Sequence, residues 1–293
     1  MELAVISGKG GTGKSSVSAA FASLHERIVL ADCDVDAANL FLLFNPVNDE
    51  EMVFVSGHKA VIDREKCTDC GHCVSYCRFD AIDVRNDEVW INEIACDGCE
   101  LCARVCPEEA IAMVPEADSR MYSGSFRKGK MVYGRLAPGE ENSGRLVDLV
   151  RKQAKEIAKK ENIATILLDG PPGIGCPVLS TITGVDHVVI VTEPTLSGLH
   201  DLKRAVELTH NYDIPTSVII NKYDLNEAIA LQIKAYCSFE GLMVVAMLPF
   251  DRRVVEAMVH CKSIVEYAPD SEVSKLLQSA CKKITHGWAV GCV

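Results

Sequence analysis

The sequence lacks three features that would place it in common functional classes. It has no surplus of positive charge, because 30 Lys and Arg face 41 Asp and Glu and the formal net charge is -11. A general nucleic-acid-binding surface is therefore not expected. No apolar run is long enough for a transmembrane helix, so a membrane protein is not expected. The chain opens directly into a strand-like segment without a signal peptide, and we expect a cytoplasmic protein.

Cysteine, by contrast, is abundant, with 14 residues in a chain of 293. In a small secreted chain this number would indicate a disulfide framework. Here the chain is long, no export signal is visible, and eight of the cysteines fall into two regular groups. Metal ligation is therefore the favoured interpretation.

Short apolar runs bounded by turns alternate with segments of helical periodicity, which predicts a doubly wound, mostly parallel α/β sheet. The predicted buried strands are residues 3–7, 27–34, 164–170, 187–194, 216–222 and 243–249. The predicted helices are residues 15–24, 142–160, 197–211, 226–240, 252–260 and 270–285. We expect residues 119–130 to be loop and residues 131–136 to be a strand that returns to the sheet.

Residues 58–118 interrupt this alternation. They are rich in cysteine and contain an internal repeat, in which residues 67–82 match residues 96–111 down to a shared Ala-Ile. Such a segment does not fit another βα unit, and insertions are tolerated at surface loops. The sequence therefore predicts a small inserted domain at 58–118 within a discontinuous nucleotide-binding domain formed by residues 1–57 and 119–293.

Residues 8–15, GKGGTGKS, fit the phosphate-binding pattern G-x-x-x-x-G-K-[ST] between a predicted strand and a predicted helix. Glycines allow successive backbone N–H groups to curl around phosphates, and the helix N-terminus adds positive potential. Lys14 would supply charge to the β- and γ-phosphates, and the Ser15 hydroxyl would ligate Mg²⁺. The predicted nucleotide-binding residues of the loop are Gly8, Lys9, Gly10, Gly11, Thr12, Gly13, Lys14, Ser15 and Ser16.

Lys9 makes this a deviant loop, K-G-G-x-G-K-[ST], and the chain here resembles the MinD, ParA and Mrp group of P-loop ATPases. The resemblance implies a homodimer that forms on ATP binding, in which Lys9 reaches the nucleotide of the partner subunit. A positive group arriving from a partner would offset charge on the transferring phosphoryl group. The alternative is a solvated loop lysine.

Two acidic segments extend the resemblance. In DCDVD, residues 32–36, Asp34 matches the position that orients the attacking water, and Asp32 lies close enough to face Mg²⁺. In LLDGPPG, Asp169 would bind the Mg²⁺ shell and Gly173 would report the γ-phosphate as a switch loop does. The alternative for the first segment is an acidic surface turn.

The segment INKYD, residues 220–224, ends a predicted strand, where nucleotides bind in open α/β sheets. By the resemblance, Asn221 would contact the base, and LPFD at 248–251 would lie near the adenine. NKYD also fits the guanine-reading motif of GTPases. The deviant loop favours ATP, whereas Asp224 leaves GTP open. The resemblance covers about residues 1–57 and 130–285.

The two cysteine groups each follow C-x₂-C-x₂-C-x₃-C and resemble bacterial two-cluster ferredoxins, in which the fourth cysteine ligates the other cluster. One [4Fe–4S] cluster would take Cys67, Cys70, Cys73 and Cys106, and the second Cys96, Cys99, Cys102 and Cys77. Zinc is the main alternative. The segment departs from the ferredoxin pattern at Arg78, which stands where a proline is expected after the fourth cysteine.

Six cysteines remain, at positions 33, 176, 237, 261, 281 and 292, and most should be buried small hydrophobic residues. Cys176 differs because it follows the switch-like DGPPGIGC. The nitrogenase iron protein has a cysteine at a similar place that holds a cluster shared between subunits. Our hypothesis is that Cys176 faces the dimer axis and holds or passes on metal. The alternative is an inert interface cysteine.

Together these features predict a dimerising, Mg²⁺-dependent ATPase that is slow without its partner. Its cycle would be coupled to electron transfer toward a partner redox or metallocofactor-assembly protein. One alternative is a carrier or scaffold that delivers iron–sulfur or other metal clusters. Another is a spatial organiser like MinD with redox-sensing clusters, which would use the last amphipathic helix on a membrane. We expect that helix to pack on the sheet instead.

Overall fold

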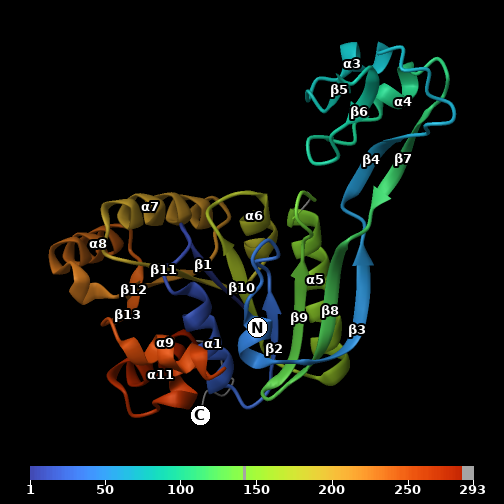
Figure 1. The fold of residues 1–293 in the computed structure, drawn as a ribbon. Coiled ribbons are helices and arrows are strands. Elements are labelled where there is room, and N and C mark those ends of the chain that lie inside the picture. Colours follow the sequence, from blue (N-terminus) through green and yellow to red (C-terminus); the bar gives the residue numbers. More distant parts are fainter. Residues whose placement is uncertain (141–142, 286–293) are drawn as a thin grey trace. The chain divides into compact units, whose positions relative to one another are not determined.

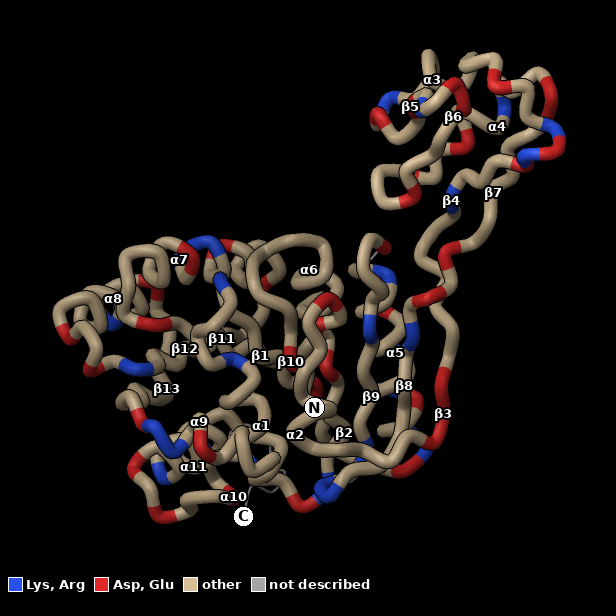
Figure 2. The backbone as a smooth tube through the Cα atoms, in the orientation of Figure 1, with Lys and Arg blue, Asp and Glu red and all other residues tan. Residues whose placement is uncertain are grey.

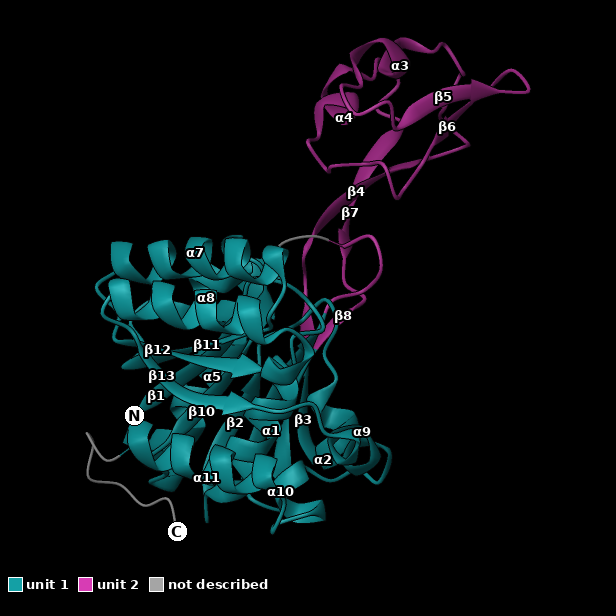
Figure 3. Ribbon diagram, turned by 90° about the vertical axis from the view of Figure 1, so that its left-hand side faces the viewer, with its two compact units in different colours: residues 1–52, 121–135, 143–293 teal, residues 53–120, 136–142 magenta. Residues whose placement is uncertain are grey.

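The computed structural model describes residues 1–140 and 143–285 (Figure 1). The chain divides into two compact units (Figure 3). Unit 1 comprises residues 1–52, 121–135 and 143–293, and unit 2 comprises residues 53–120 and 136–142. Within the described part of the chain, no helix is both long and apolar enough to cross a membrane.

Unit 1 is built on a nine-stranded sheet with the strand order β13-β12-β11-β1-β10-β2-β9-β8-β3 (Figure 1). The strands are β1 (Glu2–Ser7), β2 (Ile28–Asp32), β3 (Val47–Phe54), β8 (Ser119–Phe126), β9 (Gly129–Arg135), β10 (Ile166–Pro172), β11 (His187–Thr192), β12 (Thr216–Asn221) and β13 (Met243–Leu248). All pairs from β13 to β9 are parallel. These strands are nearly continuous apolar runs because both faces of a parallel sheet are covered. The predicted fold class is confirmed.

Helices cover both faces of this sheet, with α7 and α8 on one face and α10 and α11 on the other (Figure 3). The helical elements are α1 (Lys14–Leu24), α2 (Leu40–Phe44), α5 (Ser143–Glu161), α6 (Cys176–Ile182), α7 (Leu196–Asn211), the 3₁₀ helix η1 (Tyr223–Leu225), α8 (Glu227–Phe239), α9 (Arg252–Val259), α10 (Ile264–Tyr267) and α11 (Glu272–Thr285). The last helix buries Val273, Leu277 and Ile284 in the same core as Phe21 of α1. The expectation that it packs on the sheet is confirmed.

The structure contains two strands, β8 and β3, that the sequence did not predict. Residues 119–130 were expected to be loop, but β8 occupies residues 119–126 and lies between β9 and β3. Its serines and aromatics alternate between buried and half-buried, and Gly124 lacks a Cβ that would lie 2.1 Å from the Val47 carbonyl. Strand β3 was not predicted because its acidic side chains are exposed, so it carries little apolar signal.

Unit 2 contains two small antiparallel sheets and two short helices. Strand β4 (Gly57–Ile62) pairs with β7 (Ile111–Glu116), β5 (Ile82–Arg85) pairs with β6 (Glu88–Ile91), and the helices are α3 (His72–Tyr76) and α4 (Leu101–Val105). The internal repeat is visible in the backbone, because each helix follows a left-handed residue, Gly71 or Glu100. The apolar core of the unit consists of Ala60, Cys73, Ile82, Val89, Ile91 and Ile111.

Candidate nucleotide site and cysteine cavities

The loop between β1 and α1 leaves room for a ligand along its backbone. Gly11 and Gly13 have positive φ, 80° and 95°, which favours glycine. A Cβ on Gly13 would lie 2.3 Å from Nδ2 of Asn221, and one on Gly8 would lie 2.4 Å from Cβ of Asp201. A Cβ on Gly10 or Gly11 would meet no atom within 4 Å. The glycines therefore permit a tight loop whose outer side is open.

Lys14 and Ser15, which begin α1, converge on a buried carboxylate within β10, that of Asp169. Lys14 Nζ lies 2.9 Å from Asp169 Oδ2, the Ser15 hydroxyl donates to the same oxygen at 2.8 Å, and the Ser18 hydroxyl donates to Oδ1 at 2.6 Å. Burial acts to lower the pKa of Lys14, but the carboxylates of Asp169 and Asp34 outweigh it and raise that pKa. Lys14 therefore stays charged within a largely buried site.

Two aspartates after β2 have different surroundings. Asp34 Oδ2 lies 3.7 Å from Lys14 Nζ, and burial raises the pKa of Asp34 while Lys14 opposes the shift. Asp32 is fully buried and accepts hydrogen bonds from the backbone N–H groups of Asp34, Asn39 and Leu40 at 3.1–3.2 Å. Burial, and then the Asp169 carboxylate, raise the pKa of Asp32 to about 7. Asp32 is therefore hydrogen-bonded to the turn that carries Asp34, and the expectation that it faces Mg²⁺ stays a prediction.

The residues at this site fit a nucleoside phosphate with a divalent cation. The Thr12 hydroxyl in the loop is buried and has no hydrogen-bond partner. Ser15 and Asp169 provide a hydroxyl and a carboxylate, the oxygen ligands that Mg²⁺ prefers. Gly173 has a positive φ of 95° and open space around it, but its N–H donates to the Ser7 carbonyl at 2.9 Å. In this conformation the Gly173 N–H is therefore not free for a phosphate.

The NKYD segment at the end of β12 forms hydrogen bonds with the phosphate loop. Asn221 Nδ2 donates to the Thr12 carbonyl at 2.8 Å, and Lys222 Nζ donates to the Gly11 carbonyl at 3.1 Å. Asp224 Oδ1 accepts the backbone N–H of Phe250 at 2.7 Å, which holds the 248–251 loop beside it. The predicted base-side segments thus lie together, and contact of Asn221 with a base stays a prediction.

Lys9 points to its own chain in this structure. Its ammonium group lies 2.7 Å from Glu193 Oε1 and donates to the hydroxyls of Thr195 and Ser197 at 3.2 and 3.1 Å. No sequence motif indicates Glu193 or Ser18 as site residues. Glu193 directly follows β11, at the carboxyl edge of a parallel sheet where ligands bind, and this position could have indicated it.

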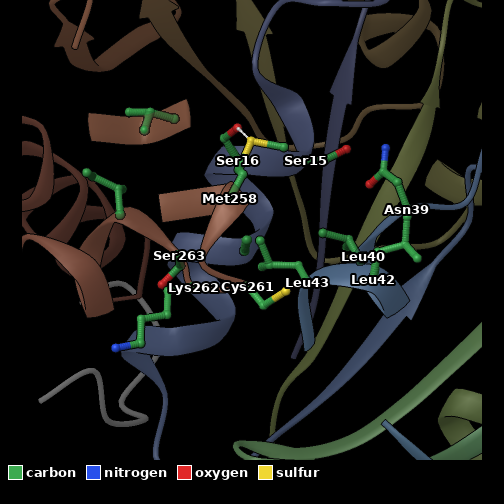
Figure 4. Close-up of a pocket in the computed structure, with 13 residues that line it drawn as sticks. Ser15, Ser16, Asn39, Leu40, Leu42, Leu43, Met258, Cys261, Lys262 and Ser263 are labelled. Carbon is green, nitrogen blue, oxygen red and sulfur yellow. Dashed lines mark hydrogen bonds between the residues drawn. The ribbon is translucent and has the colours of Figure 1, made fainter. Parts of the chain in front are cut away.

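A cavity of about 260 Å³ lies beside α1, between α2 and α9 (Figure 4). Leu40, Leu42 and Leu43 form its apolar lining, and the loop hydroxyls of Ser15 and Ser16 lie at its edge. The Ser16 hydroxyl contacts Met258 Sδ at 3.7 Å (Figure 4). The cavity can accept an apolar group next to the phosphate loop, and Ser15 and Ser16 are the predicted loop residues that line it.

Unit 2 brings the eight regularly spaced cysteines together in two separate sets of four. One cavity is lined by Cys67, Cys70, Cys73 and Cys106. A second cavity is lined by Cys96, Cys99, Cys102 and Cys77. Each cavity therefore takes three cysteines from one run and the fourth cysteine from the other run.

The thiols of each set surround a space rather than meeting at one point. Among the described residues, no three His, Cys, Asp or Glu side chains converge as a single metal ion requires. Four thiols that line one cavity are nonetheless the donor set that an iron–sulfur cluster takes. Burial raises the pKa of the Cys73 thiol, and it raises that of Cys102 to about 11. The Ala110 N–H donates a hydrogen bond to Cys106 Sγ at 3.3 Å. Arg78, which stands where the ferredoxin pattern has a proline, is exposed.

The remaining cysteines are scattered. Cys33, Cys237 and Cys281 are buried, which confirms the expectation that most of these cysteines are small hydrophobic residues of the core, whereas Cys261 is exposed. Cys292 lies outside the described residues. Cys176 is exposed at the first position of α6, and a Cβ on Gly144 of α5 would lie 3.5 Å from its Cβ.

Comparisons with known proteins cover both units. Residues 3–264 match the CobQ/CobB/MinD/ParA nucleotide binding domain. An uncharacterized protein of Methanocaldococcus jannaschii is 34% identical over 229 residues, 77% of this chain and 79% of the relative. The pyruvate synthase subunit PorD of Thermotoga maritima is 40% identical over 62 residues, 20% of this chain and 62% of that subunit. The structure of MinD with Mg-ADP from Pyrococcus horikoshii aligns with a TM-score of 0.59 and 18% identity, covering 97% of this chain and 95% of that one.

Proposed function

Because the chain belongs to the CobQ/CobB/MinD/ParA nucleotide-binding family, we propose that it is a dimerising ATPase that carries two [4Fe–4S] clusters. Its nucleotide cycle would be coupled to electron transfer toward a partner redox or metallocofactor-assembly protein. The single observation that carries this proposal is the sorting of eight cysteines into two four-cysteine cavities in a chain that also has a phosphate loop. The partial similarity to a pyruvate synthase subunit supports it.

At the nucleotide site, each residue has a task that its position supports. The loop N–H groups and Lys14 bind the phosphates, and Thr12 offers a buried hydroxyl without another partner. Ser15 and Asp169 would hold Mg²⁺, which offsets phosphate charge when bound. Asp34, close to Lys14, positions a water for attack on the terminal phosphate and accepts its proton.

At the cysteine cavities, the thiols would bind two clusters that supply one-electron redox chemistry. The run of three provides one side of each site and the distant fourth closes it, so the two sites are interlocked through Cys77 and Cys106. Neither site can form without both halves of the repeat. This interlocking favours electron passage within one unit.

Coupling between the sites would run through dimer closure. Nucleotide binding would change the conformation of residues 169–176 and bring Lys9 to the partner's nucleotide, and hydrolysis would reopen the dimer. We propose in addition that Cys176, exposed at the end of this segment, faces the dimer axis and holds or passes on metal. A Cys176→Ala protein should then lose metal content or transfer activity, and one unchanged in both would contradict this role.

A cluster carrier or scaffold is the second candidate function. One cysteine in each cavity, Cys70 or Cys99, is exposed, which would give an acceptor direct access to a cluster ligand. Electron transfer does not require that access, whereas cluster transfer does. The two functions therefore differ in whether iron leaves the protein during the nucleotide cycle.

Anaerobic EPR of the dithionite-reduced protein, with and without ATP·Mg²⁺, tests the proposal alongside iron quantitation. We expect two interacting [4Fe–4S]⁺ signals that shift when nucleotide binds. In Lys14→Ala, the matched control, the clusters should be present but their signals should ignore ATP. Wild-type signals that do not change when ATP is added would contradict coupled electron transfer. If, in addition, iron moves to an added apo-acceptor, the cluster-carrier function replaces electron transfer as the proposed function.

A further inference from the structure

Lys9 is fully engaged by its own subunit. An ammonium group has three N–H donors, and three oxygens lie within reach: Glu193 Oε1 at 2.7 Å, Thr195 Oγ1 at 3.2 Å and Ser197 Oγ at 3.1 Å. A lysine in this position must give up these partners before it can bind anything else. It is therefore not the solvated loop lysine that remained an alternative from the sequence.

The site that holds Lys9 is built on rigid elements. Thr195 is the N-cap of α7, and its hydroxyl accepts the Gly198 N–H at 2.9 Å. Glu193 follows β11 directly, and its second oxygen lies 3.4 Å from Lys222 Nζ, which in turn donates to the Gly11 carbonyl. Glu193 therefore stays in place beside Lys222 when Lys9 leaves, and only the lysine side chain has to move.

We propose that Glu193 is a positioning residue that holds Lys9 in the single subunit and releases it when the dimer closes. This inference rests on the proposed function, in which Lys9 binds the partner's nucleotide. A phosphate oxygen of the partner's nucleotide then replaces the Glu193 carboxylate as the ligand of the ammonium group. Dimer closure breaks two Lys9–Glu193 ion pairs, one in each subunit. Glu193 therefore raises the dissociation constant of the nucleotide-bound dimer.

The test is Glu193→Gln, which keeps the shape of the side chain and removes its charge. Partly exposed ion pairs contribute about 0.5–1 kcal/mol, a factor of roughly 2 to 5, and two are broken in each dimer. The dimer dissociation constant, measured by sedimentation with a non-hydrolysable ATP analogue, should therefore fall by about 5- to 25-fold. Ser197→Ala removes one hydrogen bond and should shift the constant in the same direction by a smaller factor.

Glu207→Gln is the matched control, because Glu207 is an exposed carboxylate of α7 far along the helix from Lys9. It should leave the dissociation constant unchanged. In a Lys9→Ala background, Glu193→Gln should have no effect on dimerisation, because the pair no longer exists. Analogue affinity of the dilute single subunit should be the same in wild type and Glu193→Gln.

The outcomes separate this inference from the function on which it rests. If Lys9→Ala dimerises as wild type does, the proposed role of Lys9 across the interface fails and the inference fails with it. If Lys9→Ala prevents dimerisation while Glu193→Gln matches wild type or dimerises more weakly, only the inference is overturned. A loss of analogue affinity in single Glu193→Gln subunits would also overturn it, because Glu193 would then act through Lys222 on the nucleotide loop.

Discussion

The two units differ in what holds them together. Unit 1 has a continuous apolar core that reaches from Leu3 of β1 to Ile284 of α11 and includes fully buried Phe21 and Met131. Unit 2 has a core of six residues, one of them Cys73, edged by further cysteines. A unit of 75 residues with so little apolar burial is marginal by itself. Unit 1 thus depends on hydrophobic packing, whereas unit 2, under the proposed function, would depend on the clusters that its thiols bind.

Charge divides the units in the same way. Unit 1 has 25 acidic and 23 basic residues, whereas unit 2 has 16 acidic and 7 basic residues, so unit 2 carries most of the net charge of -11 (Figure 2). Repulsion among these acidic groups opposes compaction of the small unit. The difference teaches that one chain can combine a unit stabilised by its apolar core with a small acidic unit that, under the proposed function, would need bound clusters for its stability.

The largest expected effect is the loss of unit 2 when iron is removed. Metal binding contributes folding free energy on the order of 10 kcal/mol in small metal-dependent domains, so the metal-free unit should unfold. Hydrogen exchange of chelator-treated protein should show rapid exchange in β4 and β7 and unchanged protection in β1 and β10. Mock-treated protein without chelator is the control. Slow exchange of β4 and β7 in the iron-free protein would show that unit 2 folds without bound clusters.

Substitutions at Cys106 and its neighbours test whether the fourth cysteine of each run ligates the cluster of the other run. Cys106→Ser should lose about half of the iron, and adding Cys67→Ser should lose no more, because both line one cavity. Adding Cys96→Ser instead should remove nearly all of the iron. Iron quantitation gives the readout, and exposed Cys261→Ser is the matched control. If Cys106→Ser with Cys96→Ser keeps half of the iron, each run holds its own cluster and the crossed assignment is wrong.

Unit 1 should lose catalysis without losing structure when Asp34 is changed. Asp34→Asn removes the carboxylate that we propose positions the attacking water, and the ATPase rate should fall by about 100-fold or more while ATP still binds. Iron content and the fold of unit 2 should be unaffected. Asp36→Asn, an exposed change in the same turn, is the control. A rate within a few-fold of wild type would exclude Asp34 from the chemistry.

The smallest expected effect concerns a surface ion pair of unit 1. Burial would raise the pKa of Glu266, but the Arg127 guanidinium, at 2.7 Å, and Ser263 outweigh it and lower that pKa to about 2. A depressed carboxyl pKa contributes stability above the unfolded value near 4.5, and the contribution is lost as pH falls toward 2. Glu266→Gln should therefore cost about 1 kcal/mol at pH 7 and less at pH 3.

Urea unfolding of the metal-free protein, followed by far-ultraviolet circular dichroism at both pH values, measures this difference. A loss of several kcal/mol at pH 7 would show that unit 1 depends on surface charge more than on its core. An equal loss at pH 7 and pH 3 would contradict the proposed cause, because the charge of Glu266 would then not matter.

The sequence by itself determined the features that are local in the chain. The phosphate loop needs consecutive glycines before Lys14 and Ser15, and each cysteine run needs three thiols within seven residues, so both can be read directly. Parallel strands such as β1 and β11 are continuous apolar runs because they are buried on both faces. The strands at the far edge, β3 and β8, carry polar residues and gave no such signal.

Only the tertiary structure decided which distant side chains meet. Glu193 holds Lys9 because β11 lies next to β1 in the sheet, and nothing near Lys9 in the sequence indicates this neighbour. Asp32 and Asp34 are alike in sequence, but backbone N–H groups surround the first and Lys14 lies near the second. The physical reason is that ion pairs and hydrogen bonds depend on positions set by strand order, whereas loops and ligand runs depend on local spacing.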